Sequence, residues 1–217
     1  MQSLKRILGT FSIALLALSL SFPAAASGKS KKKSRHHEPA FSGSQVPLAK
    51  LRSEPLPRPS GHLVLANVNF KGETLDLNIY NADGTFSDDS LDKLYHFWRC
   101  RRTGTEKPIN PHLFEILSVI YDHFQQPIEL VSGFRNQEHT TSFHFHGSAS
   151  DIRIAGVDAD VLHEYVTTLD PGGMGIGRYP RAHFVHVDVR PEPSYRWTDR
   201  SPPGENMGHP HKKHHNS

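Results

Sequence analysis

Two stretches of the chain carry histidine and aspartate in a pattern that can bind a metal ion. His144 and Asp151 lie seven residues apart with Gly147 between them, so the chain can turn and bring both side chains together. His186 lies further along. Imidazole and carboxylate are groups that ligate Zn²⁺, and three protein ligands with a fourth position left for water are typical of a catalytic site.

Predicted strands would hold two of these residues. The apolar pattern of residues 152–154 predicts a strand that fixes Asp151. Alternate residues of a strand face the same way, so His186 and Asp188 point together and away from the flanking valines. If the valines face the core, His186 faces a cleft. The chain has 16 histidines, so histidines at this spacing are also expected by chance. The spacing taken alone therefore does not require a metal site.

Hydrophobic patterning predicts helices and strands without a regular βαβ rhythm. Strands are expected over residues 62–68, 74–80, 128–131 and 184–189, and helices are expected after Ser87 or Asp88, after Asn110 and after Asp158. The glycines of residues 172–177 predict a tight connection into the last strand. We therefore expect the α+β class: a central antiparallel sheet with helices packed on one face, in a single compact domain.

Composition limits the class of the 217-residue chain. Hydrophobic residues make up 36%, and the mean hydropathy of −0.52 excludes a polytopic membrane protein. The formal charge of +3 is too small to indicate a nucleic-acid partner. Cys100 is the single cysteine, so it cannot form an internal disulfide, and we expect it to be buried.

Both ends of the chain are expected to lie outside the folded domain, at residues 62–199. Residues 1–26 have the charged start, apolar run and small-residue site of a cleavable secretory signal. Residues 27–61 predict a basic, proline-rich disordered linker, and residues 200–217 a histidine-rich disordered tail that binds metal loosely or is merely solvated. The signal predicts an exported protein of the periplasm or cell envelope, with no stable membrane span after cleavage.

Four elements in this order resemble the zinc D-Ala-D-Ala carboxypeptidase and murein endopeptidase family, whose fold is similar to the hedgehog signalling domain. A hairpin and helix come first, followed by Ser132-Gly133-Phe134-Arg135, then Ser142-x-His144-x-x-Gly147-x-Ala149-x-Asp151, and finally Val185-His186-Val187-Asp188. The match covers residues 75–197. Within the family, the chain is most similar to the exported murein endopeptidases with a Phe-Val-His-Val-Asp strand.

The resemblance implies roles for individual residues. Arg135 would contact the substrate carboxylate or the polarised carbonyl, since its guanidinium can meet a carboxylate bidentately, although a structural salt bridge is the alternative. Ser142 would support the turn, and His146 occupies a variable position that is not expected to ligate. One zinc ion per chain would be held by His144, Asp151 and His186.

Two residues are candidates for the general base. Many relatives have an acid or histidine three positions before the last ligand, which here is His183. Three positions along a strand lead to the opposite face unless the chain bends. Asp188 shares the face of His186, but it can instead orient that ring through its second nitrogen.

The resemblance and the signal together predict the function. We expect a monomeric zinc metallopeptidase that hydrolyses peptide cross-links of peptidoglycan in cell-wall remodelling, with peptidoglycan peptides as partners. One alternative is a D,D-carboxypeptidase. Another is a non-catalytic, metal-containing envelope binding module, which the absence of a glutamate at the expected base position would fit.

Overall fold

A computed structural model describes residues 38–136 and 140–204 of the chain. The expected signal peptide, the first part of the expected linker and most of the expected tail lie outside these residues. Within the described ranges, no helix is long and apolar enough to cross a membrane.

Strands outnumber helices in the described residues. The strands are β1 (Phe41–Gln45), β2 (His62–Asn67), β3 (Thr74–Asn78), β4 (Ile128–Ser132), β5 (Ala149–Ile154), β6 (Met174–Tyr179), β7 (Phe184–Val189) and β8 (Tyr195–Asp199). The helices are α1 (Asp88–Phe97), α2 (Pro111–Phe124) and α3 (Ala159–Thr168), with a short 3₁₀ helix, η1 (Leu48–Lys50).

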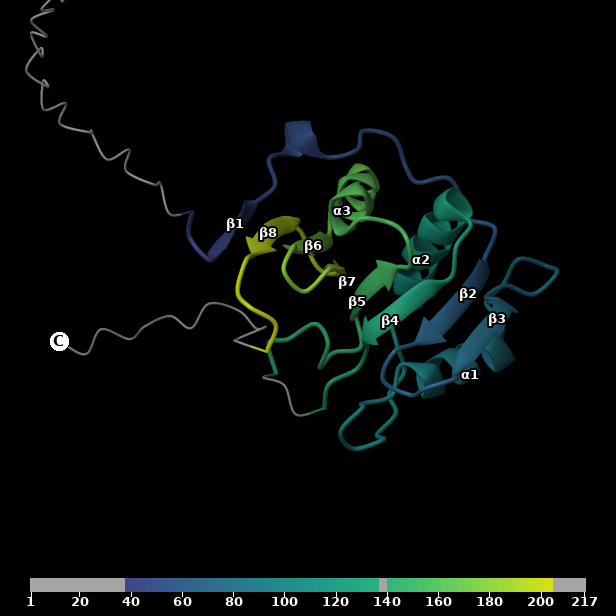
Figure 1. Ribbon diagram of the computed structural model, residues 1–217. Helices are drawn as coiled ribbons and strands as arrows, with labels where there is room; N and C mark the ends of the chain where they lie inside the picture. The colour runs from purple at the N-terminus through teal and green to yellow at the C-terminus, as the bar shows by residue number, and fades with distance from the viewer. Residues whose placement is uncertain (1–37, 137–139, 205–217) are drawn as a thin grey trace, which may run out of the picture. The chain divides into compact units, whose positions relative to one another are not determined.

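All these strands join one sheet in the order β1-β8-β6-β7-β5-β4-β2-β3 (Figure 1). The expected α+β class is confirmed, but the sheet is mixed. The pairs β2–β4 and β6–β8 are parallel, whereas the other five pairs are antiparallel. Parallel neighbours need a long crossover, and the chain between β2 and β4 supplies it through β3, α1 and α2.

The sheet begins earlier than the expected domain boundary at residue 62. Strand β1 lies within the segment expected to be linker and pairs antiparallel with β8 at the edge of the sheet. Its sequence is polar and four of its five residues are exposed, so the apolar alternation that indicates a strand is missing. Backbone pairing with β8 forms this strand in place of side-chain burial.

Helix starts follow the local sequence as expected. Ser87 caps α1 by accepting a hydrogen bond from the Ser90 amide, and Asp158 caps α3 in the same way. Asn110 caps α2, where Pro111 takes the first helical position because it has no N–H to satisfy. These caps determine where each helix begins, and hence which residues face the core.

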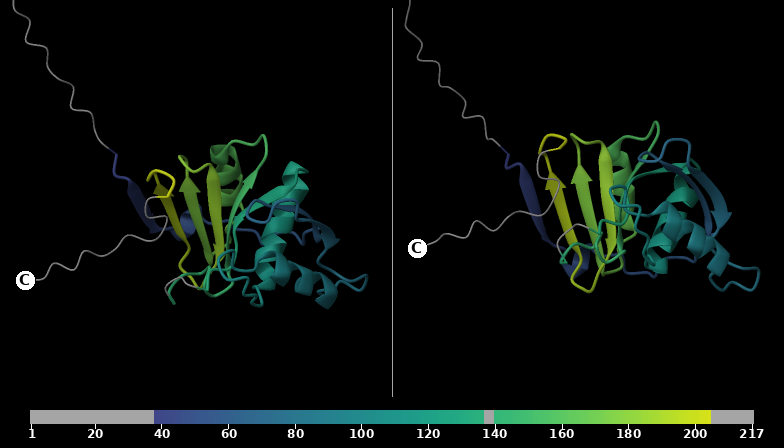
Figure 2. Two further views of the ribbon diagram at one scale, coloured as in Figure 1. Left: turned by 60° about the horizontal axis from the view of Figure 1, so that its bottom comes forward. Right: turned by 90° about the horizontal axis from the view of Figure 1, so that it is seen from below.

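The helices α2 and α3 lie on the same side of the row of strands (Figure 1). Figure 2 looks at the other face of the sheet, so the strands lie in front of α3. The apolar stripe of α2 is fully buried against the sheet at Leu113, Phe114 and Leu117. Val185 and Val187 of β7 join this core. Cys100 is buried, as expected.

Candidate metal centre

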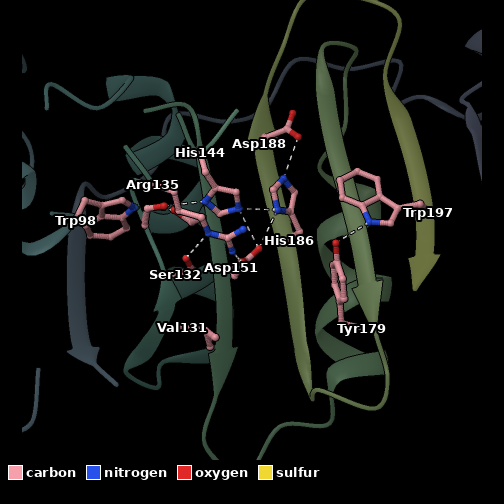
Figure 3. A network of polar contacts seen from close by, with 12 residues as sticks. Trp98, Val131, Ser132, Arg135, His144, Asp151, Tyr179, His186, Asp188 and Trp197 are labelled. Atoms are coloured by element: carbon pink, nitrogen blue, oxygen red, sulfur yellow. Dashed lines mark hydrogen bonds and ion pairs between the residues drawn. The ribbon is translucent and has the colours of Figure 1, made fainter. Parts of the chain in front are cut away.

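Three side chains distant in sequence converge on the sheet face opposite α2 and α3 (Figure 3). Asp151 on β5 and His186 on β7 are directly opposite each other in the antiparallel register. His144 comes from the turn before β5. Among the described residues, these three form the one group of histidine, cysteine and acidic side chains whose ligand atoms lie close enough together for a single metal ion.

The spacing of the three ligand atoms fits a zinc ion. His144 Nε2 lies 3.2 Å from His186 Nδ1 and 3.3 Å from Asp151 Oδ1, and the latter two atoms are 2.8 Å apart. A tetrahedral zinc ion with ligand bonds of 2.0–2.1 Å separates its ligand atoms by about 3.3 Å. Two imidazoles and one carboxylate are also the chemistry that zinc prefers.

Hydrogen bonds to the other ring nitrogens orient both histidines. His144 Nδ1–H donates to the Gly133 carbonyl at 2.7 Å, and His186 Nε2–H donates to Asp188 Oδ2 at 3.0 Å. Both partners are acceptors, so they assign the ring protons and leave His144 Nε2 and His186 Nδ1 with free lone pairs. Those two lone pairs belong to the nitrogens that face Asp151.

The turn that presents His144 depends on Gly147. Its φ of 70° lies in the left-handed region, and a Cβ at this position would lie 2.8 Å from the Pro108 carbonyl oxygen. The Gly147 carbonyl accepts a hydrogen bond from the Asn110 amide at 2.8 Å, which ties the turn to the start of α2. The glycine between the two predicted ligands therefore has the turning role expected from the sequence.

Burial and neighbouring charges shift the pKa values of the three groups. Burial lowers the pKa of His144, and the charge of Asp151 only partly offsets this. Burial also disfavours charge on His186, but the carboxylates of Asp151 and Asp188 beside its ring raise its pKa overall. For Asp151, burial is outweighed by the charges of His144 and Arg135, which hold its pKa well below the usual range. The carboxylate is thus ionised, as a metal ligand must be.

Asp188 is fully buried behind the ring of His186. Besides accepting from His186, its carboxylate accepts from Arg190 Nε at 2.7 Å and from Arg190 Nη2. Gly175 lies opposite Asp188 on β6, and a Cβ there would overlap both the carboxylate and the guanidinium. Asp188 therefore contacts the ring nitrogen of His186 that faces away from His144 and Asp151. It is not one of the three converging side chains.

Arg135 lies at the edge of the triad. Its Nη2 donates to Asp151 Oδ2, and its Nε donates to Ser132 Oγ at 2.7 Å (Figure 3). The other carboxylate oxygen, Asp151 Oδ1, faces the two histidines. Arg135 and Asp151 also line a common cavity, so this positive charge borders a space that a substrate group can enter.

The structure does not bring His183 into the triad. This residue is exposed in the turn between β6 and β7, with a φ of 54°. His183 is not one of the side chains whose ligand atoms come together at the triad. His146, expected not to ligate, is exposed and takes no part in the triad.

An aromatic pair beside His186 was not singled out from the sequence. Trp197 on β8 lies with its ring 5.0 Å from that of His186, and its indole N–H donates to the Tyr179 hydroxyl at 3.0 Å. In the sheet, Gly177 of β6 lies between His186 of β7 and Trp197 of β8, and a Cβ at this glycine would overlap the indole. Glycine within a strand indicates a close approach of this kind, but the sequence predicts a tight connection for residues 172–177.

Comparison with known proteins gives consistent matches. The family model described as peptidoglycan L,D-endopeptidase MepK matches residues 58–195. The chain is 27% identical over 166 residues to peptidoglycan L,D-endopeptidase MepK of Escherichia coli (strain K12), covering 70% of this chain and 88% of that protein. It is 32% identical over 154 residues to a probable peptidoglycan L,D-endopeptidase MepK of Haemophilus influenzae, covering 64% and 79%. No solved structure matches this chain significantly.

Proposed function

Since this chain belongs to the peptidoglycan L,D-endopeptidase MepK family, we propose that it is a zinc-dependent peptidase that hydrolyses peptide cross-links of peptidoglycan. The observation that carries the proposal is the convergence of His144, Asp151 and His186 within the matched residues, with ligand atoms 2.8–3.3 Å apart. Together with the predicted signal, it supports action in the periplasm or cell envelope on peptidoglycan peptides.

The three converging side chains would hold one zinc ion. Zinc bound there supplies a Lewis acid that polarises the peptide carbonyl and makes water more acidic. The hydrogen bonds to Gly133 and Asp188 keep the two rings in position, so little reorganisation is needed during the reaction.

Arg135 and Asp188 take different roles in this proposal. Arg135 presents its charge beside Asp151, where it favours negative charge developing on the carbonyl oxygen of the substrate. Asp188 is a positioning residue, because its carboxylate is engaged by His186 and Arg190. We do not assign His183 as the general base, since it lies in an exposed turn and is not one of the three converging side chains.

Digestion of purified peptidoglycan by the full chain tests the proposed activity. We expect cross-linked muropeptides to be converted to monomers, with the reaction lost on chelation and regained on addition of zinc. Mass spectrometry of the products identifies the bond that is cut. Release of terminal D-alanine alone would instead make the protein a carboxypeptidase, and one tightly bound zinc without any product would favour a binding module.

Substitution of Asp188 by asparagine tests its positioning role. Removing the charge that holds His186 Nε2–H is expected to weaken zinc binding about 10- to 100-fold, and saturating zinc should restore most of the activity. Zinc competition with a chromophoric chelator and kcat/KM at low and high zinc measure the two effects. Activity that stays low at saturating zinc would contradict a role limited to positioning the zinc ligand.

The hairpin β2–β3 offers a matched control for this substitution. Asp76 also accepts a hydrogen bond from a histidine, since its Oδ1 lies 2.7 Å from His62 Nε2. This pair is exposed, and β4 and β2 separate its strand β3 from β5. Asp76→Asn should leave zinc affinity and activity unchanged.

A further inference from the structure

The hydroxyl of Tyr179 lies beside the triad on the side of β6. Tyr179 is opposite Phe184 of β7, on the same sheet face as Gly177 and His186, which are paired two residues further along. Gly177 has no side chain, so the Tyr179 ring extends along the sheet until its hydroxyl meets Trp197 (Figure 3). The ring of Trp197 is itself 5.0 Å from that of His186. The hydroxyl is therefore close to the last of the three converging residues.

This hydroxyl has a proton to donate. In its hydrogen bond with Trp197 Nε1 at 3.0 Å, the hydroxyl oxygen is the acceptor, because an indole nitrogen only donates. Among the described residues, this is the one hydrogen bond that the hydroxyl makes. Burial raises the pKa of Tyr179, and the negative charge of Asp151 raises it further. The O–H therefore stays protonated and can donate to a ligand.

The Tyr179 side chain is held at both ends. Its ring stacks on the buried Phe184, with centroids 4.3 Å apart and planes 20° apart. At the other end, the buried indole of Trp197 binds the hydroxyl oxygen. A donor that is already in place stabilises developing charge without reorganisation.

Tyr179 and Arg135 approach the triad from opposite sides. Asp151 and His186 lie on the neighbouring strands β5 and β7, Arg135 follows β4 on one flank, and Tyr179 ends β6 on the other. In hydrolysis of an amide, the oxygen of water adds to the carbonyl carbon, which becomes tetrahedral with two oxygens that carry the developing negative charge. The C–N bond then breaks and the leaving amine takes up a proton. Two donors on opposite flanks match two oxygens on one carbon.

We propose that Tyr179 is a catalytic residue whose O–H donates to the oxygen of the tetrahedral intermediate that faces β6. This inference rests on the proposed function and adds a donor opposite Arg135. The hydroxyl keeps its proton throughout, so it stabilises charge and takes no part in proton transfer. Trp197 is then a positioning residue, because its N–H holds the hydroxyl oxygen.

Tyr179→Phe removes the hydroxyl and retains the stacked ring. We expect kcat for a soluble cross-linked peptide to fall about 100-fold with KM nearly unchanged, because the lost contact forms only as charge develops. A peptide with a phosphinate in place of the scissile amide imitates the intermediate, since it has two oxygens on a tetrahedral phosphorus. Its inhibition constant should rise about 10- to 100-fold, as expected for a lost hydrogen bond to a charged group. Zinc affinity, measured by competition with a chromophoric chelator, should not change.

Tyr195→Phe is the matched control. Tyr195 lies on β8 and also packs against Trp197, with ring centroids 6.0 Å apart. Its hydroxyl lies over Gly43 of β1, where a Cβ would be 2.8 Å from it. Strands β8 and β6 separate β1 from β7. This variant should retain wild-type kcat and phosphinate binding.

A double variant separates the donor role from support of Trp197. In Tyr179→Phe the buried indole N–H loses its acceptor, and an unpaired buried donor destabilises the fold. Combining Tyr179→Phe with Trp197→Phe removes both partners, and thermal unfolding checks that each variant is folded. The double variant should keep the loss of kcat. Recovery of wild-type kcat would overturn the proposal, because the loss would then come from the unpaired indole.

The outcomes separate this inference from the proposed function. Unchanged kcat and phosphinate binding in Tyr179→Phe would overturn the inference and leave the peptidase activity standing. A loss that saturating zinc restores would also overturn it, because the hydroxyl would then support metal binding. A wild-type chain that cuts neither the peptide nor intact peptidoglycan would contradict the proposed function itself.

Discussion

Asp151→Asn is expected to reduce hydrolysis of peptidoglycan cross-links by on the order of 1000-fold, equivalent to about 4 kcal/mol of transition-state stabilisation. The substitution preserves the shape of the side chain but removes the only anionic group of the proposed ligand set. A neutral amide is a poor ligand for zinc beside two imidazoles. Arg135 would also lose the carboxylate that it contacts.

The zinc content and the hydrolytic activity of purified Asp151→Asn are both measured to test this prediction. We expect less than one zinc per chain after dialysis and a matching loss of muropeptide monomers. Asp160→Asn is the control, because Asp160 also pairs with an arginine, Arg178, but at the start of α3. A variant at position 151 that retained wild-type activity would remove Asp151 from the proposed centre. Thermal unfolding of both variants checks that each is folded.

Phe114→Ala is expected to lower the free energy of unfolding by about 3–5 kcal/mol. Phe114 is fully buried on α2, and its ring meets Trp98 edge-on with centroids 5.0 Å apart. Truncation removes apolar contact and leaves a cavity that a well-packed core fills only in part. Trp98 in turn donates from Nε1 to Ser150 Oγ at 2.8 Å, next to Asp151, so this packing also supports β5 beneath the triad.

Urea unfolding followed by tryptophan fluorescence measures this loss of stability. Val161→Ala provides the comparison, because Val161 lies on α3 with 52% of its surface exposed and its truncation should change stability by less than about 0.5 kcal/mol. Equal effects of the two substitutions would show that the α2 face is not the main source of stability.

Local patterns determined most of the regular structure. The caps at Ser87, Asn110 and Asp158 depend on contacts within a few residues, so they can be predicted from sequence. Strands β1 and β8 were not predicted. The polar β1 is held by backbone pairing at the sheet edge, and a strand of that kind has no side-chain periodicity to detect.

Strand β6 shows a different limit. Its glycines at 175 and 177 indicate a turn when considered alone, but in the folded chain they make room for Arg190 and Trp197. The residues that need this room come from β7, β8 and the segment between them, so no local pattern announces them.

The sequence by itself determined the chemistry of the candidate centre: two histidines and one aspartate in family order, with a glycine that allows the turn. Only the tertiary structure distinguished the roles of the neighbouring residues. His183 and Asp188 are similarly close to His186 in sequence, yet a left-handed turn exposes one, and Arg190 and Gly175 enclose the other beneath the ring. The cavity that Arg135 and Asp151 line likewise depends on β4 and the turn after α1 meeting in space. Residue type and spacing specify which ligands are available, whereas strand register and packing decide what each side chain can reach.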